Sequence, residues 1–180
     1  GTTTIVIDTG PDFREQMISA NIGSADGVLF THAHADHIHG IDDLRSFFIN
    51  RRERVEIWAD AVTSVRMHEA FGYCFKTPEG SRYPPILKEN RITAGEPFTI
   101  DGQGGPIPVT PYEMPHGSID CLGFRIGALA YCSDVSALDE RALPHLDDLD
   151  VLIIDALQYK THANHLSGLQ RAVVFGQAER

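Results

Sequence analysis

The sequence has few of the features that mark secreted, membrane-bound or disulfide-rich proteins. Its three cysteines, Cys74, Cys121 and Cys132, form no C-x-x-C pair, which argues against a disulfide framework and against a cysteine zinc cage. No apolar run approaches the roughly 20 residues of a membrane-spanning helix, and the N-terminus lacks the basic and apolar regions of a signal peptide. We therefore expect a cytoplasmic protein with no membrane partner.

Positive charge is also scarce. The 15 Lys and Arg residues stand against 25 Asp and Glu residues, which gives a formal net charge of −10 at pH 7. Because this charge opposes attachment to a polyanion, strong nucleic-acid binding is not expected. A length of 180 residues with 42% hydrophobic residues is typical of one globular domain, which we assign to residues 1–180.

Strand-like and helix-like segments alternate along the chain. Apolar, β-branched runs predict strands over residues 2–7, 27–30, 55–58, 107–109, 122–126, 128–132 and 151–154. Helical spacing of apolar residues predicts helices after Asp12, from about Ile41, and over residues 61–71, 137–143 and 166–180. This alternation favours an α/β (α+β) fold of packed sheets covered by helices. Residues 72–90 show no clear apolar period, which predicts an ordered surface loop that acts either as a substrate lid or as a dimer contact.

The unusual feature is the placement of nine histidines, because His32, His34, His37 and His39 fall within eight consecutive residues. In an extended segment alternate side chains share a side, so His32 and His34 can hold one metal ion. Asp36 and His37, at the start of the next helix, then point towards a second position nearby. Imidazole and carboxylate ligands favour zinc, manganese, iron or cobalt over calcium or magnesium. The alternative interpretation is a solvated, histidine-rich loop.

The segment His32-Ala-His34-Ala-Asp36-His37 resembles the His-x-His-x-Asp-His signature of the metallo-β-lactamase-fold hydrolases. Further segments resemble that family in the same order: Asp8 matches an aspartate that supports a ligand, His116 a third histidine, and Asp134 a carboxylate that bridges two ions. The resemblance implies a four-layer αβ/βα sandwich of two mixed β-sheets flanked by helices. It also implies two divalent ions, zinc or manganese, held by His32, His34, His116, Asp36, His37 and Asp134.

The segment His162-Ala-Asn-His165-Leu-Ser resembles the phosphodiesterase branch of that family, which includes enzymes that open phosphoribosyl 1,2-cyclic phosphate. This resemblance implies that a small phosphodiester, such as a cyclic sugar phosphate or nucleotide, is cleaved by hydroxide generated between two metals. Asp36 and Asp134 would orient the hydroxide, and His165 would protonate the leaving oxygen. His162 is the second choice for that acid, and Asp155 is placed to orient a histidine.

The chain also departs from the family pattern. The family's opening β-hairpin and its last strand, which carries a further histidine ligand, have no counterpart here, so we expect the domain to lack both. Two other functions stay open: a thioesterase or other ester hydrolase of the same fold, and a non-catalytic protein that binds a phosphorylated small molecule. Association into a homodimer is also left open.

Overall fold

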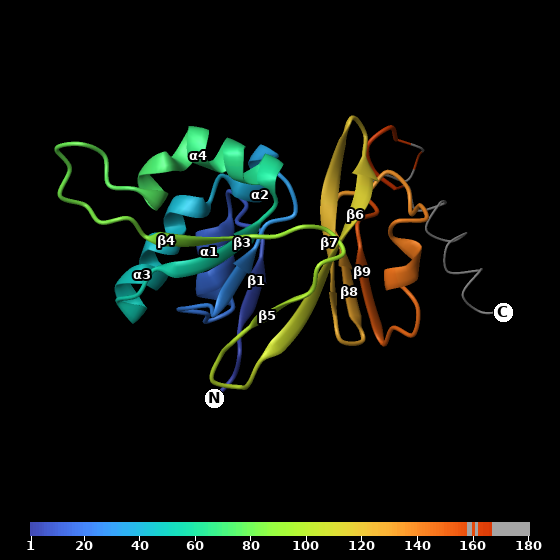
Figure 1. The fold of residues 1–180 in the computed structure, drawn as a ribbon, viewed down its shortest axis with the longest axis horizontal. Coiled ribbons are helices and arrows are strands. Elements are labelled where there is room, and N and C mark those ends of the chain that lie inside the picture. The colour runs from blue at the N-terminus through green and yellow to red at the C-terminus, as the bar shows by residue number, and fades with distance from the viewer. Residues whose placement is uncertain (158–159, 161, 167–180) are drawn as a thin grey trace. The chain divides into compact units, whose positions relative to one another are not determined.

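The computed structural model describes residues 1–157, 160 and 162–166 (Figure 1). The described residues form two compact units: residues 1–93 with 99–107, and residues 94–98 with the described residues from Pro108 onward. Among the described residues, none of the helices combines the length and the hydropathy needed to cross a membrane.

The first unit contains a four-stranded sheet with the order β1-β2-β3-β4, and all of its pairings are parallel. Its strands are β1 (Ile5–Ile7), β2 (Gly27–Leu29), β3 (Val55–Ala59) and β4 (Leu87–Arg91). Parallel neighbours need crossover connections, which the helices supply. These are α1 (Phe13–Ser19), α2 (Ala35–Ile38), the 3₁₀ helix η1 (Ile41–Leu44), α3 (Arg45–Arg51) and α4 (Ala61–Phe75).

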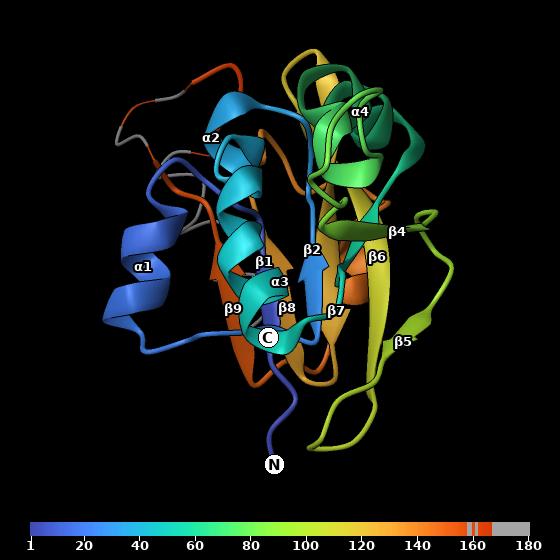
Figure 2. The same cartoon turned by 90° about the vertical axis from the view of Figure 1, so that its left-hand side faces the viewer.

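One face of this sheet is covered by α1, α3 and α4, as Figures 1 and 2 show. Val28 and Ile57 project from the strands into a core that also contains Phe13 of α1 and Phe47 of α3. The rings of Phe13 and Phe47 meet edge to face with centroids 5.7 Å apart. This packing holds the loops that follow β1 and β2 on a rigid base.

The second unit contains a mixed sheet in which β6, β7, β8 and β9 follow one another. These strands are β6 (Ile107–His116), β7 (Ile119–Ile126), β8 (Leu129–Cys132) and β9 (Val151–Ile154), and the 3₁₀ helix η2 (Leu143–His145) lies between the last two. The short strand β5 (Phe98–Ile100) stands where the chain passes from the second unit back to the first. The turns after β6 and β7 each begin with a glycine at positive φ, Gly117 at 62° and Gly127 at 58°, as two-residue hairpin turns require.

The structure corrects the expected helix over residues 137–143. Of these described residues none is α-helical, and the 3₁₀ turn at Leu143–His145 is the regular element that follows. The carboxylate of Asp139 accepts hydrogen bonds from the backbone N–H and the guanidinium of Arg141, at 3.0 and 2.8 Å. Local bonds of this kind compete with helix formation, and Pro144 follows. Leu138 and Ala142 still pack into the core of this unit.

The expected loop over residues 72–90 is also shorter than predicted. Helix α4 continues to Phe75, and Leu87–Arg91 forms β4, so the loop itself runs from Lys76 to Ile86. The helix expected over residues 166–180 lies outside the described residues except for Leu166, which is buried.

Candidate metal-binding and catalytic site

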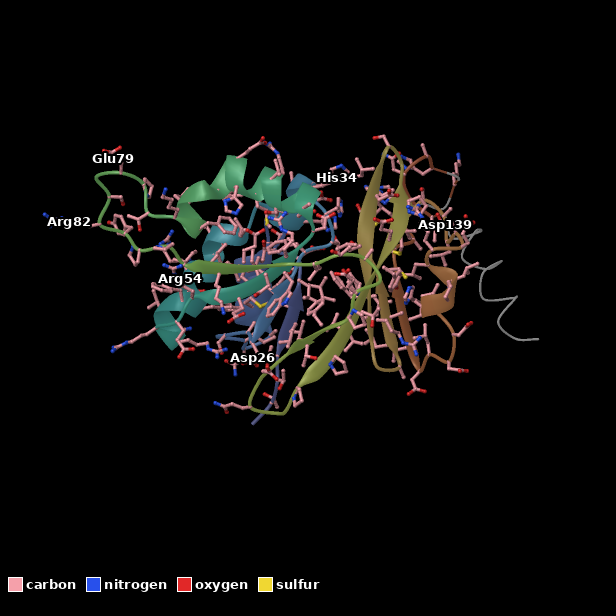
Figure 3. All side chains as sticks on the ribbon, viewed as in Figure 1. Asp26, His34, Arg54, Glu79, Arg82 and Asp139 are labelled. Carbon is pink, nitrogen blue, oxygen red and sulfur yellow. The ribbon has the colours of Figure 1, made fainter. Side chains whose placement is uncertain are left out.

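In the first unit, the candidate ligands lie where parallel strands end. The strands β1 and β2 are parallel, so their carboxyl ends meet at one edge of the sheet. Asp8 follows β1, while Thr31, His32 and His34 follow β2 within five residues of its end. His34, labelled in Figure 3, directly precedes α2 and has extended backbone angles, whereas Asp36 and His37 lie inside that helix.

Asp8 is the buried centre of this cluster. One carboxylate oxygen, Oδ1, accepts the backbone N–H of Thr31 at 2.8 Å. The other, Oδ2, accepts the Thr31 hydroxyl and the Nδ1–H of His37, each at 2.8 Å. Burial raises the pKa of Asp8 above its usual value, and the hydrogen bond and charge of His37 oppose that rise. Asp8 also has a left-handed backbone with φ of 60°, a conformation that non-glycine residues seldom adopt.

These hydrogen bonds determine which ring nitrogen of each histidine carries the hydrogen. A carboxylate only accepts, so His37 donates from Nδ1. His32 Nδ1 lies 2.9 Å from the Thr31 hydroxyl oxygen, whose own hydrogen goes to Asp8, so His32 also donates from Nδ1. In the neutral rings Nε2 then carries the lone pair, the form in which histidine binds a metal. His32 Nε2 lies 3.0 Å from His34 Nδ1, so two ring nitrogens converge on one position.

A second position in this unit involves Asp36 and His37. Asp36 Oδ2 lies 3.6 Å from His37 Nε2, and the Asp36 side chain is 72% exposed. The turn after β1 is tied to this helix, because Thr9 N–H donates to the His37 carbonyl at 2.7 Å and Gly40 N–H donates to the Thr9 carbonyl at 2.8 Å. A side chain at Gly40 would collide with the Gly10 carbonyl oxygen, so the close approach requires glycine there.

In the second unit, three strands end at the same edge. β6 and β8 are each antiparallel to β7, and β9 is parallel to β8, so β6, β8 and β9 run in one direction. His116 is the last residue of β6, Asp134 stands two residues after β8, and Asp155 follows β9 directly.

His116 is held in the same way as His32 and His37. Its Nδ1–H donates to the backbone carbonyl of Asn164 at 2.8 Å, so Nε2 again carries the lone pair in the neutral ring. That Nε2 lies 3.6 Å from Asp134 Oδ2. The His116 side chain is buried, with an exposed fraction of 2%.

His165 forms a tight pair with Asp155. Its Nδ1–H donates to Asp155 Oδ2 at 2.7 Å, and the other oxygen of Asp155 accepts the Leu157 N–H at 2.9 Å. The ring of His165 lies 5.1 Å from that of His116 and 5.3 Å from that of His162. Asp134, Asp155 and His165 each offer one ligand atom within 4.8 Å of the others.

Within each unit the structure thus brings together predicted residues that are far apart in the sequence. The first unit joins Asp8 to the signature histidines, and the second joins His116 and Asp134 to the Asp155–His165 pair. Sequence reasoning missed Thr31, which carries the hydrogen bond from His32, and the Asn164 carbonyl, which orients His116. The position of Thr31 directly before the signature was an available signal, but a backbone carbonyl such as that of Asn164 gives none.

Comparison with known proteins identifies the relatives of this chain. The family model of the beta-lactamase superfamily domain matches residues 3–176. An octanoyltransferase of Porphyromonas gingivalis is 33% identical over 176 residues, which make up 96% of this chain and 34% of that protein. The chain therefore spans about a third of the length of this curated relative.

Solved structures show the same fold. A diphosphatase from the PhnP family has a TM-score of 0.84 at 30% identity, covering 97% of this chain and 64% of that one. Human tRNase Z, short form, has a TM-score of 0.68 at 15% identity, covering 97% and 77%, which is a likeness of fold alone. Together with the four- and five-stranded sheets and their helices, these matches confirm the predicted fold class.

Proposed function

Because the chain belongs to the metallo-β-lactamase-fold hydrolases, we propose that it hydrolyses a small phosphodiester with two divalent ions, zinc or manganese, as cofactors. The observation that carries the proposal is the placement of the ring hydrogens of His32, His37 and His116. Each donates from Nδ1 to an oxygen atom within its own unit, at 2.8 to 2.9 Å. Histidines that bind metals nearly always donate the second ring N–H in this way.

The proposed ligand sets are those that the family signature implies. His32, His34 and His116 would hold one ion, and Asp36, His37 and Asp134 would hold the other. Imidazole nitrogens and carboxylate oxygens suit zinc and manganese, and the tautomers described above fit that role. When bound, such ions lower the pKa of a water towards neutrality and neutralise the charge on phosphoryl oxygens.

The remaining tasks fall to side chains of the chain itself. The carboxylates of Asp36 and Asp134 would orient the attacking water. The protonated ring of His165 would donate from Nε2 to the leaving oxygen, while Asp155 holds Nδ1 and stabilises the positive ring. This division assigns proton delivery to the second unit.

The proposed substrate class, a small phosphodiester, is supported by the kind of phosphorus atom that a related enzyme attacks. In a phosphodiester and in a substituted diphosphate, the phosphorus under attack carries two bridging oxygens. The 30% identity to a diphosphatase therefore supports a phosphorus centre of this kind. A small phosphorylated molecule also suits a protein whose formal charge of −10 disfavours long nucleic acids.

A direct test measures hydrolysis of bis-p-nitrophenyl phosphate by the whole chain loaded with zinc or manganese. His34→Ala and Asp134→Ala should abolish turnover. His68→Ala is the matched control, because His68 is a half-exposed histidine that pairs with Glu89 at 2.8 Å, and it should retain activity. Undiminished turnover in either of the first two variants would contradict the proposal.

The second candidate is cleavage of a thioester, which the octanoyltransferase match favours. Acyl transfer through a cysteine is not supported, because Cys74, Cys121 and Cys132 are all buried. Hydrolysis of a thioester by water is the form of this chemistry that the site could support. Comparing phosphodiester with thioester turnover by the metal-loaded protein distinguishes the two. A nucleotide that is retained unchanged would instead indicate a binding protein.

A further inference from the structure

We propose that Thr31 is a positioning residue. Its hydroxyl donates a hydrogen bond to Asp8 and accepts one from His32, and this relay sets the tautomer of that histidine. The tautomer follows from the contacts within the first unit alone. Its consequence for metal binding rests on the function proposed above.

The argument begins with the single hydrogen of the Thr31 hydroxyl. Asp8 Oδ2 lies 2.8 Å from this oxygen, and a carboxylate accepts hydrogen bonds, so the hydroxyl hydrogen points to Asp8. His32 Nδ1 lies 2.9 Å from the same oxygen and must therefore donate to it. The chain of donation runs from His32 through Thr31 to Asp8. The same carboxylate also receives the direct bond from His37.

The Thr31 hydroxyl and the His32 ring are shielded from solvent. Thr31 is 1% exposed and His32 is 2% exposed, so bulk water does not reach between them. The backbone N–H of Thr31 also binds Asp8, at Oδ1, and valine or serine at position 31 keeps that donor. Thr31→Val therefore leaves the backbone tie to Asp8 in place and removes the relay alone.

Loss of the relay acts on His32 Nε2. Once the Thr31 hydroxyl is removed as the acceptor, the neutral ring gains by moving its hydrogen to Nε2, which lies 3.0 Å from His34 Nδ1. A ring protonated at Nε2 cannot use that atom as a ligand. Removal of hydrogen-bond partners behind metal ligands typically weakens metal binding about 10- to 100-fold, and we expect Thr31→Val to fall in this range.

The chain supplies two matched controls. Thr31→Ser keeps the hydroxyl and should preserve the tautomer and the zinc affinity. Thr9→Val removes another fully buried hydroxyl close by, and the hydroxyl oxygen of Thr9 has no hydrogen-bond partner among the described atoms. Thr9→Val therefore reports the general effect of this substitution on the same part of the fold.

The test reads the tautomer directly from two-bond ¹H–¹⁵N spectra of the whole, metal-free chain with ¹⁵N-labelled histidine, at about pH 8, where histidine is ordinarily neutral. His32 should carry its hydrogen on Nδ1 in the wild type, in Thr31→Ser and in Thr9→Val, and on Nε2 in Thr31→Val. An Nδ1 hydrogen that persists in folded Thr31→Val overturns the proposal.

Zinc affinity, measured by competition with a chromophoric chelator, gives the second readout. A loss of about 10- to 100-fold in Thr31→Val, restored by Thr31→Ser and absent in Thr9→Val, supports the relay. Equal losses in Thr31→Val and Thr9→Val overturn it, since both would then reflect packing. A wild-type protein inactive on phosphodiesters overturns the proposed function instead, and the spectra separate the two results.

Discussion

His165 donates its Nδ1–H to the carboxylate of Asp155, with 2.7 Å between the two heavy atoms. The other oxygen of Asp155 is fixed by the N–H of Leu157, so the carboxylate is held on both sides. Asp155 directly follows β9, which makes it part of the rigid sheet. The sheet thus orients a histidine that belongs to the irregular segment after the last described strand.

The Asp155–His165 pair predicts a dependence on the leaving group. His165→Ala should lower kcat on an alkyl phosphodiester about 100- to 10,000-fold, the usual contribution of a general acid. The loss on bis-p-nitrophenyl phosphate should be far smaller, because p-nitrophenolate leaves without a proton. Asp155→Ala should show the same pattern with a smaller loss. Steady-state kinetics on both substrates check this, with His162→Ala as control; a larger effect in that control would make His162 the acid.

Metal removal should lower the stability of the protein. Binding to the folded state alone adds about 2.7 kcal/mol to the free energy of unfolding when the free ion is at 100 times its Kd. Calorimetry with zinc and with excess chelator should therefore show a higher Tm with zinc. His32→Ala and His116→Ala should lose most of this shift, and His68→Ala should keep it. An unchanged shift in His32→Ala would contradict the ligand assignment.

The pKa of His145 predicts a loss of stability in mild acid. Burial lowers this pKa, and the nearby charge of Arg125 lowers it further, while the ring stacks on Tyr112 with centroids 4.7 Å apart. As pH falls below about 6.5, the unfolded chain takes up the proton before the folded protein does. The resulting loss of stability grows until the pH reaches the lower, folded pKa, keeps its full size below that pKa, and vanishes above about pH 7.

His145→Phe retains an aromatic ring against Tyr112 and removes the titration. Urea midpoints at pH 7.5 and 5.5 should therefore fall less in this variant than in the wild type. His162→Phe changes an exposed histidine of the same unit and should leave the fall unchanged. Equal falls in the wild type and His145→Phe would show that His145 is not responsible.

The three cysteines should be unreactive in the folded protein. Burial raises the pKa of Cys74 to about 12 and that of Cys132 to about 11, so little thiolate forms near neutral pH. Cys121 is also buried, and its thiol donates to the Asp134 carbonyl at 2.7 Å. Mass spectrometry after iodoacetamide treatment at pH 8 should find no modification without urea and three modifications in urea. Rapid labelling of any one cysteine in the native protein would reopen cysteine chemistry.

Much of the fold could be predicted because its buried strands are short apolar runs with clear ends. β9 was predicted with the bounds that the structure has, since Val151–Ile154 lies between aspartates. β4 was missed because Leu87–Arg91 is mostly polar, and its position is fixed by parallel pairing with β3. The prediction of a helix at 137–143 was wrong. Its apolar spacing correctly marked residues that are buried, but the hydrogen bonds between Asp139 and Arg141 hold the backbone in turns.

The site divides in the same way. The ligands of the His32–His37 signature are local, so the spacing of the sequence identified them. The hydrogen bonds that orient them join residues separated by 23 positions, Asp8 and Thr31, and by 48 positions, His116 and Asn164. Spacing cannot reveal such partners, because they are set by which strand ends meet at one sheet edge.

Asp8 serves the proposed site at a cost to the stability of the fold. A buried carboxylate and a left-handed backbone at one non-glycine residue both reduce the stability of the native state, the backbone alone by about 1 to 2 kcal/mol. Glycine at this position would relieve both, but it would also remove the acceptor of the Thr31 N–H, the Thr31 hydroxyl and the His37 N–H. The heat resistance of a variant at position 8 therefore depends on which of these effects is larger, whereas selection for turnover would retain Asp8. Thermostable variants of this scaffold are best sought with position 8 held fixed.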